Sequence, residues 1–282
     1  MGNTQSAVKL AGIVLLASAA FAAGEGRKDL RYIVGPHAAV SITNEYGPIS
    51  VKPGAANQVL VTAVTHSGKV EIDQTQRGNR IDVLSHLLPG ADQESGRVDY
   101  EVQVPPDASL MLRSTTGPLH AEKLRGDVTV EGATGTVDVR DISDAHVHIK
   151  TLKGPITLTN IHDGHVEVTS VSGEVIMDSV TGPLVQVNST SGRIRYDGDF
   201  GNAGEYRLAS HTGDIEATAP DDASIEVIAH SVRGKVENDF RLQPKHTPFT
   251  IKAGSAFAGT MNKAASSVKL FSFSGKIHLK KR

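Results

Sequence analysis

The chain has 282 residues, 21% of them charged, and a formal net charge of −2, so its charge gives no reason to expect nucleic acid or an anionic membrane surface as the partner. Only 4% of the residues are aromatic, Trp and Cys are absent, and Gly reaches 28 residues. This composition excludes disulfides and favours a thin core of Val, Ile and Leu over a broad globular core.

Residues 1–22 have the features of a secretory signal. A short polar stretch with Lys9 precedes an apolar run over 10–22, which ends in Ala20-Phe21-Ala22, a small-x-small cleavage pattern. The run is short for a membrane span, which needs about 20 residues. We therefore expect cleavage after Ala22, no transmembrane segment in the mature chain, and a periplasmic, cell-surface or secreted location. An uncleaved anchor is the alternative.

We expect residues 23–105 to form an irregular β region that contains the first coils and continues into the rest of the chain. Two weak copies of a glycine phrase occur, Tyr46-Gly47-Pro48-Ile49-Ser50-Val51 and Ser67-Gly68-Lys69-Val70-Glu71-Ile72. Alternating apolar residues indicate strands around 81–84 and 98–104, with a polar loop over 88–96 between them.

Residues 106–282 predict a β-solenoid. A phrase of the form Gly-x-[Ile/Val/Leu]-x-[apolar or Tyr/Asn] begins at eight glycines: Gly117, Gly135, Gly154, Gly173, Gly192, Gly213, Gly234 and Gly275. The first seven are spaced by 18 to 21 residues, and the last gap of 41 residues would hold two coils if the weaker Gly254 is counted. A fixed period of this length is typical of one short unit stacked on copies of itself. We therefore expect an all-β, single-stranded parallel β-helix with about 19 to 21 residues per coil.

In each coil the spacing of apolar residues predicts two short strands, each with one buried face. After the glycine, positions two and four are mostly apolar, and before it positions seven and five are too, as in Ile156, Leu158, Val147 and Ile149 around Gly154. In four consecutive coils an apolar residue also follows seven places after the glycine, which we interpret as packing inward at a bend: Leu124, Ile142, Ile161 and Val180.

A column of small hydroxyl residues should also face inward. The position three before the glycine shares the parity of the buried strand and is Ser or Thr in seven coils: Ser114, Thr151, Ser170, Ser189, Ser210, Ser231 and Ser272. An unpaired buried hydroxyl costs about 1–3 kcal/mol. We expect each hydroxyl to bond a backbone carbonyl at the turn or the hydroxyl of the next coil, and the glycine to allow a close approach at a corner.

Two further features concern the carboxyl-terminal strand and two similar turns. Lys276, Lys280, Lys281 and Arg282 give the last strand a charge that suits an exposed end of the stack. The phrases over 106–109 and 221–224 both read Asp-Ala-Ser after a Pro or Asp and precede a strand, so they predict turns at which a strand restarts.

A family resemblance runs from about Val40 to Lys280. The phrase over 44–51, the phrase Val102-Gln103-Val104-Pro105-Pro106-Asp107-Ala108 and the repeated Ser/Thr-x-x-Gly-x-Ile resemble the bacterial "putative adhesin" family of uncharacterised exported β-solenoids. The resemblance implies a right-handed parallel β-helix, similar to the head domains of cell-surface and envelope-stress proteins, and it carries no catalytic residues. Several relatives attach the domain to a membrane segment, which this chain lacks after residue 22.

Histidine is the first candidate for a site. His146 and His165 both lie eight residues before their glycines and should stack one strand apart, with His148 and His162 nearby. A zinc or copper site needs three or four converging ligands with supporting hydrogen bonds. No Cys and no obvious carboxylate completes the group, so solvated turn histidines are the favoured interpretation and we assign no metal.

Carboxylates are the second candidate, because parallel β-helices include polysaccharide lyases and hydrolases. Asp178 and Asp197 should lie outward on adjacent coils, and a catalytic pair would need about 5 Å between them. Arg193, Arg195 and Glu216 alternate in sign around them, which is ordinary for a solvated sheet face. The aromatic residues, Tyr196 and Tyr206 among them, fall mostly on inward positions, so no sugar platform is evident.

No other motif carries chemistry. Arg125-Gly126-Asp127 spells an integrin tripeptide, but the repeat itself needs a glycine there. Calcium-binding turns, phosphate loops, nucleophile elbows and zinc-hydrolase helices are absent. We assign no catalytic or cofactor-binding residue and expect no enzyme activity and no cofactor.

Three functions remain open. The first is a non-catalytic exported solenoid that presents an adhesin-like surface to a protein or glycan of the envelope. The alternatives are a carbohydrate-active enzyme on the same scaffold, or a periplasmic structural or stress-sensing component. The sequence indicates no oligomeric state.

Overall fold

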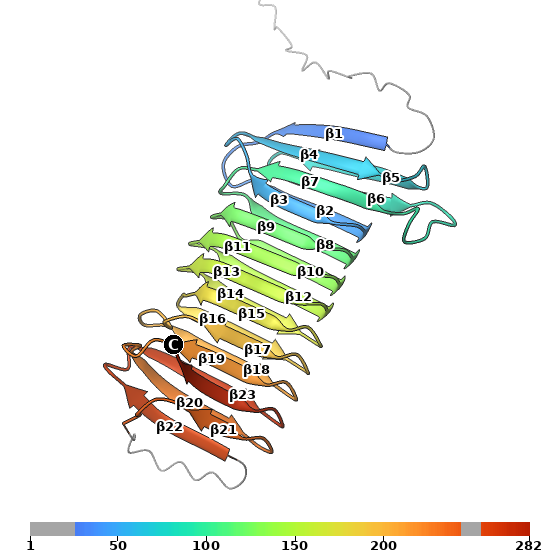
Figure 1. Cartoon of the computed structure of the whole chain (residues 1–282). Helices are drawn as coiled ribbons and strands as arrows, with labels where there is room; N and C mark the ends of the chain where they lie inside the picture. Colours follow the sequence, from blue (N-terminus) through green and yellow to red (C-terminus); the bar gives the residue numbers. More distant parts are fainter. Residues whose placement is uncertain (1–25, 244–254) are drawn as a thin grey trace, which may run out of the picture.

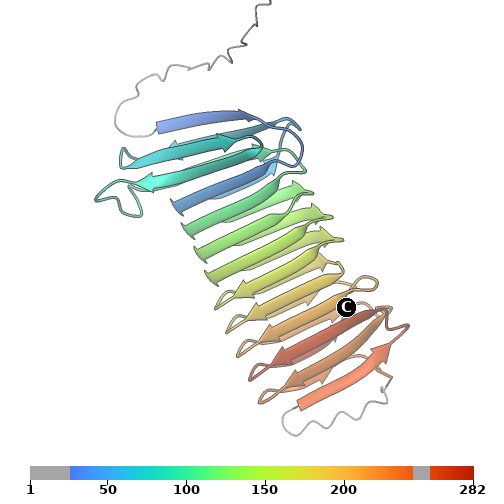
Figure 2. The ribbon, with the colours of Figure 1, turned by 180° about the vertical axis from the view of Figure 1, so that it is seen from behind.

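The computed structural model describes residues 26–243 and 255–282. These residues form 24 β-strands arranged in two twelve-stranded sheets, and no helix in either range is long and apolar enough to cross a membrane. The predicted signal segment 1–22 and the weak repeat glycine Gly254 lie outside the described residues. The all-β solenoid prediction is confirmed, and the two sheets face each other along the whole stack (Figures 1 and 2).

Each repeat builds one coil of two strands, one in each sheet. We call the sheet that contains β9 sheet A and the one that contains β8 sheet B. The regular coils, each given as its sheet-B strand and then its sheet-A strand, are β8(Ser109–Thr116) and β9(Leu119–Leu124), β10(Val128–Thr134) and β11(Val137–Ser143), β12(His146–Lys153) and β13(Ile156–His162), β14(His165–Ser170) and β15(Val175–Val180), β16(Leu184–Ser189) and β17(Ile194–Asp197), and β18(Glu205–Ser210) and β19(Ile215–Ala219).

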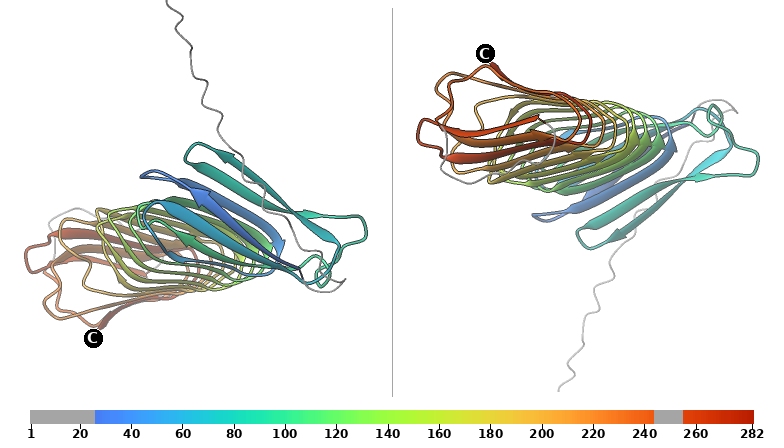
Figure 3. Two further views of the ribbon diagram at one scale, coloured as in Figure 1. Left: turned by 90° about the horizontal axis from the view of Figure 1, so that it is seen from above. Right: turned by 90° about the horizontal axis from the view of Figure 1, so that it is seen from below.

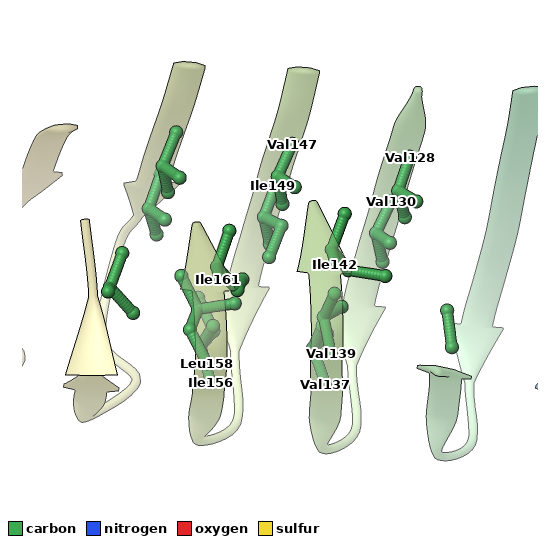
Figure 4. Packing of buried hydrophobic residues seen from close by; sticks show 14 of the residues in the cluster. Val128, Val130, Val137, Val139, Ile142, Val147, Ile149, Ile156, Leu158 and Ile161 are labelled. Carbon is green, nitrogen blue, oxygen red and sulfur yellow. The ribbon is translucent and has the colours of Figure 1, made fainter. Parts of the chain in front are cut away.

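Equivalent residues of successive coils lie in register. Val137 pairs with Ile156 in sheet A and Val147 pairs with Val166 in sheet B, in parallel strands one coil apart. Seen along the stack, the coils lie over one another (Figure 3). The predicted inward columns are buried, and their Val, Ile and Leu side chains fill the space between the sheets (Figure 4).

A left-handed residue explains why the seventh position after the glycine faces inward. Lys123, Asp141, Asn160 and Ser179 lie one position earlier in four coils, each with φ between 53° and 56°. This conformation adds one residue to the strand, so that the residues after it face the opposite side from the one that simple alternation would give. Leu124, Ile142, Ile161 and Val180 are therefore buried, as predicted.

The repeat glycines touch the glycine of the neighbouring coil. A Cβ on Gly192 would lie 1.9 Å from the carbonyl oxygen of Gly173, and a Cβ on Gly154 would lie 1.9 Å from that of Gly135. Any side chain at these corners would force adjacent coils apart, so close backbone approach is a reason for glycine at these corners, and at Gly154 the φ of 105° is a second one.

The hydroxyl column is buried as predicted, and the glycine corner supplies its partners. The Gly213 amide donates to Ser210 Oγ at 2.9 Å, and Ser210 Oγ donates to the Gly192 carbonyl of the preceding coil at 3.4 Å. Ser231 Oγ makes the same pair of bonds, with the Gly234 amide and the Gly275 carbonyl. The predicted carbonyl bond is present at Ser170, Ser210, Ser231 and Ser272. It is absent at Ser114 and Thr151, whose buried hydroxyls have no hydrogen-bond partner, so the prediction was wrong at these two positions.

The amino-terminal region contains one regular coil and a set of hairpins. The strands are β1(Gly26–Ile33), β2(Ala39–Tyr46), β3(Ile49–Pro53), β4(Gln58–Thr65), β5(Val70–Arg77), β6(Arg80–Leu87) and β7(Val98–Val104). β2 and β3 form the coil at Gly47, whose carbonyl meets Gly117. A Cβ added at Gly68 would meet no atom within 4 Å, and β5 after it pairs antiparallel with β6, so the copy of the repeat at Gly68 was a wrong prediction. The residue belongs to the connection between β4 and β5, which has no partner coil.

The carboxyl-terminal coil lies inside the stack, which corrects the prediction of an exposed end. The strands are β20(Ile225–Ser231), β21(Val236–Asn238), β22(Ser255–Met261), β23(Ser266–Ser272) and β24(Ile277–Lys281). β23 lies between β18 and β20, and β24 lies between β19 and β21. The coil of Gly275 therefore precedes the coil of Gly234 in space (Figure 1).

The charges of the last strand favour this internal position. Lys280 Nζ lies 2.9 Å from Glu216 of β19, and Lys276 Nζ lies 2.6 Å from Glu237 of β21. Arg282 pairs with Asp197 and Lys281 with Asp221. The four cations that suggested a solvated end are each paired with a carboxylate of a neighbouring segment.

The two similar turns are the places where the chain steps over a coil. Residues 105–109 connect β7 to β8 across the β2–β3 coil, and residues 220–224 connect β19 to β20 across the β23–β24 coil. The skipped coil docks on each turn: Ser109 N–H donates to the Ala38 carbonyl at 2.8 Å, and Ser266 N–H donates to the Ser224 carbonyl at 3.0 Å.

Candidate functional site

Aromatic side chains gather on the outer face of sheet B near the carboxyl-terminal end of the stack. We call this group the aromatic patch and define it by six residues of β18, β20, β23 and the corners that follow them: His211, His230, Val232, Arg233, Phe271 and Phe273. Five of these side chains point outward because each lies an odd number of residues from a buried strand position, and Arg233 is exposed in the corner that follows β20.

The patch is ordered by stacking along the coil axis. The rings of His211 and Phe273 are parallel, with centroids 4.9 Å apart, and the Arg233 guanidinium lies 4.8 Å from the Phe273 centroid on the next coil. In the adjacent column the His230 and Phe271 rings lie 5.8 Å apart at 52°. The spacing between members of the stack equals the distance between neighbouring strands, about 4.8 Å.

The patch combines exposed aromatic and cationic side chains: Phe271, His211 and Arg233 are exposed, and the other three residues are half-buried. Phe271 retains 45% of its surface and is one of the few large hydrophobic side chains that are exposed among the described residues. Exposed clusters of this kind, bordered by polar residues, mark interaction sites more often than isolated surface hydrophobics do.

The sequence did not indicate this group, because the group depends on the order of the coils in the stack. In a stack built in chain order, Phe271 and Phe273 would lie on the last coil, and no further coil would supply a partner for them. The insertion of β23 between β18 and β20 brings Phe273 against His211 and Arg233, which lie 62 and 40 positions earlier in the chain. The odd spacing of the two phenylalanines from Ser272 was the available signal.

The histidine pair stacks as predicted. The His146 and His165 rings are parallel with centroids 4.8 Å apart. His148 pairs with Glu167 at 3.3 Å, and His162 Nδ1 lies 3.0 Å from Thr181 Oγ1, so neither turns toward the stacked pair. No group of three or more His, Cys, Asp or Glu able to hold a metal occurs within 26–243 or 255–282.

The carboxylate pair lies on adjacent strands as expected, and cations surround it. Asp178 and Asp197 are register partners beside a cavity of about 210 Å³ that Arg195 and Glu216 also line. Arg282 pairs with Asp197. Lys280 and Arg195 hold the pKa of Glu216 below its usual value, which is the opposite of what a general acid in glycoside hydrolysis requires.

The tripeptide Arg125-Gly126-Asp127 has a structural role. A Cβ on Gly126 would lie 2.1 Å from the Ala108 carbonyl oxygen, and Asp127 Oδ1 accepts a hydrogen bond of 2.9 Å from the His146 amide. The glycine and the aspartate thus connect neighbouring coils at the second corner.

Buried aromatic residues explain the longer coil between Gly192 and Gly213. Tyr196 and Tyr206 face inward as predicted, and Phe200 turns in between them with φ 61°. The Tyr196 and Phe200 centroids lie 4.4 Å apart, and those of Phe200 and Tyr206 lie 5.1 Å apart. Burial raises the pKa of Tyr206 to about 12, so this phenol stays protonated near neutral pH.

Comparison with family models places nearly the whole described chain in one family. The model of the Toastrack family, DUF4097, matches residues 37–280. The chain belongs to the Toastrack family. The two flat sheets and the stacked coils described above are the Toastrack fold of this chain, and the predicted family resemblance is confirmed. Among curated proteins none matches the chain.

Three solved structures are similar to this Toastrack chain at low identity. A putative adhesin from Bacteroides fragilis has 9% identity, covers 91% of this chain and 97% of its own, and gives a TM-score of 0.47. A putative cell adhesion protein from Clostridium sporogenes has 9% identity over 91% and 100% of the two chains, with a TM-score of 0.30. A putative adhesin from Parabacteroides merdae has 10% identity over 90% and 95%, with a TM-score of 0.33.

Proposed function

We propose that this Toastrack chain is a non-catalytic, exported module that presents an adhesin-like interaction surface to a protein or glycan of the bacterial envelope or cell exterior. The observation that carries the proposal is the aromatic patch, an ordered and accessible group on a flat sheet face. Because the strands on both sides of it belong to a continuous stack, the scaffold holds the patch with little conformational freedom, which lowers the entropy cost of binding.

The chemistry of the surface supports a binding role over catalysis. Of the carboxylates around the candidate pair, Asp197 is paired with Arg282, and Glu216 is paired with Arg195 and Lys280. The apolar run over 10–22 supports export. The predicted periplasmic stress-sensing role would require the same export and a membrane-protein partner.

Export and binding can be tested together. The full chain, expressed in a bacterium, should appear shortened by about 22 residues in the periplasmic, surface or secreted fraction. Purified mature chain should be retained on isolated envelope material, and the double variant Phe271→Ala/Phe273→Ala should be retained less, whereas Ile33→Ala at the other end of the stack should behave as the parent. A cytoplasmic, unprocessed chain, or retention that the double variant leaves unchanged, would contradict the proposal.

A further inference from the structure

The aromatic patch carries a cation that no carboxylate of the described chain neutralises. Arg233 contacts the Phe273 ring and forms no ion pair within 26–243 or 255–282. The patch itself contains no carboxylate. The nearest acidic group of β18, Glu205, already pairs with Arg207 and Lys269, both at 2.8 Å.

One aromatic ring in the patch has space beside it. Phe271 pairs in register with Ala209 on one side and with His230 on the other. The methyl group of Ala209 is too small to cover the side of the ring that faces β18, which agrees with the 45% exposure of Phe271. A guest of ring size can therefore pack against Phe271 with His211 and Arg233 close by.

The backbone around the patch offers nothing to a peptide strand. β23 is paired on both sides, with β18 and β20, so its amides and carbonyls are already bonded within the sheet. Addition of a strand needs a free sheet edge, and helix docking needs a groove. Recognition at this face must use side chains alone: an uncovered aromatic ring, a guanidinium and two imidazoles.

Resting on the proposed function, we propose that the aromatic patch binds a carboxylate-bearing glycan. A sugar ring packs its C–H face against Phe271, and a uronate carboxylate of the chain accepts hydrogen bonds from Arg233, which is the strong, geometrically defined type of charge-assisted contact. The spacing of the stacked groups, 4.9 and 4.8 Å, runs parallel to the axis of the solenoid, so an extended glycan lies along this axis across successive coils.

The test is calorimetric titration of the full mature chain with four probes: sodium polygalacturonate, sodium hyaluronate, neutral dextran and polyglutamate. We expect saturable binding of at least one acidic glycan that weakens with added salt, and no binding of dextran. Arg233→Gln should weaken this binding by about tenfold, since a charged hydrogen bond is lost. Phe271→Ala should weaken it to a similar extent.

Two matched variants control for general effects. Arg125→Gln removes an exposed arginine at the opposite corner that forms no ion pair within the described residues, and Ile33→Ala removes an exposed apolar side chain that is 67% accessible. Both should bind as the parent does. Circular dichroism of all four variants should match that of the parent.

Three results would overturn this inference: no binding of either acidic glycan, equal binding of dextran or polyglutamate, or binding that Arg233→Gln and Phe271→Ala leave unchanged. A chain that is exported and retained on envelope material but shows one of these results would refute the glycan site and leave the proposed function standing. An unexported chain that binds the acidic glycans through the patch would refute the proposed function and leave the glycan site standing.

Discussion

At the scale of single residues, a serine and the glycine three residues after it act together at the corner of five coils, those of Ser170, Ser189, Ser210, Ser231 and Ser272. The serine accepts a hydrogen bond from the glycine amide of its own coil, and the glycine lets the neighbouring coil approach to van der Waals contact. The hydroxyl replaces a backbone partner that the turn itself cannot supply, and a buried amide without one would be costly.

Gly192→Ala should destabilise the fold strongly. The new Cβ would lie 1.9 Å from the Gly173 carbonyl oxygen, although the backbone at Gly192 is not left-handed, so the effect is steric. We expect a loss of about 2–4 kcal/mol in the free energy of unfolding, measured by denaturant titration.

Gly132→Ala is the matched control. Gly132 occupies the serine position of its coil, and an added Cβ would meet only Leu119 at 3.6 Å and Thr151 at 3.7 Å. This variant should be neutral or more stable by about 0.4–1 kcal/mol, because it restricts the unfolded chain. Equal losses in the two variants would show that close approach is not the reason for the repeat glycines.

Ser210→Ala and Ser114→Ala should differ in the same assay. Ser210→Ala leaves the buried Gly213 amide without its acceptor and should cost about 1–3 kcal/mol. Ser114 Oγ has no hydrogen-bond partner in the structure, so its removal should cost much less. Similar costs at both positions would argue against the corner hydrogen bond as the source of stability.

At the scale of elements, the periodicity of the sequence predicted the strands and buried positions within each coil better than the order of the coils in the stack. The buried columns, the two strands per coil and the bend at position seven follow from residues that repeat within one coil, because the neighbours of each side chain are copies of itself. The position of the last coil depends on contacts between different coils, such as Lys280 with Glu216, which the repeat does not encode.

The candidate site was unpredictable for the same reason. The side chains of Phe271 and Phe273 were predictable as outward-facing from their spacing to Ser272, but their neighbours were not. The repeated turns over 105–109 and 220–224 were the one sequence signal of a coil that is stepped over, and the similarity of the two phrases predicted a restart without its direction.

Acid should loosen the last coil. Hydrogen bonds from Lys280 and Lys276 hold the pKa of Glu216 and of Glu237 below the unfolded value of about 4.3. A lowered folded pKa contributes stability above the unfolded pKa, and this contribution is lost as the pH falls through the folded pKa. Hydrogen-exchange protection over 266–282, corrected for intrinsic rates, should fall between pH 6 and pH 3 more than protection over 147–170.

The lysines provide the control for this effect. Lys276→Met/Lys280→Met should reduce protection of 266–282 at pH 6 and should show a smaller further loss at pH 3. A variant with the full acid response of the parent would exclude these ion pairs as its cause.

At the scale of the whole molecule, the stack should tolerate the loss of one complete coil. Deletion of residues 155–173 removes 19 residues, one repeat, and joins Gly154 to Glu174, so that β15 follows β12 with like residues above and below. We expect a folded, less stable protein with the same type of circular dichroism spectrum and cooperative unfolding. Deletion of 155–168 breaks the register and should not fold, and equal behaviour of the two deletions would contradict register as the basis of the fold.

The order of the coils is the claim on which the aromatic patch depends, and engineered disulfides measure it directly because the chain has no cysteine. Arg207 and Lys269 are outward register partners on β18 and β23, one strand spacing apart, which is within the range that a disulfide bridges. Arg207 and Ile228 would be partners only if the coils followed chain order, and here they lie on either side of Lys269, about two strand spacings apart. We predict that Arg207→Cys/Lys269→Cys forms an intramolecular disulfide on mild oxidation of the folded protein and that Arg207→Cys/Ile228→Cys does not; the reverse result would contradict the inserted coil and the patch that it builds.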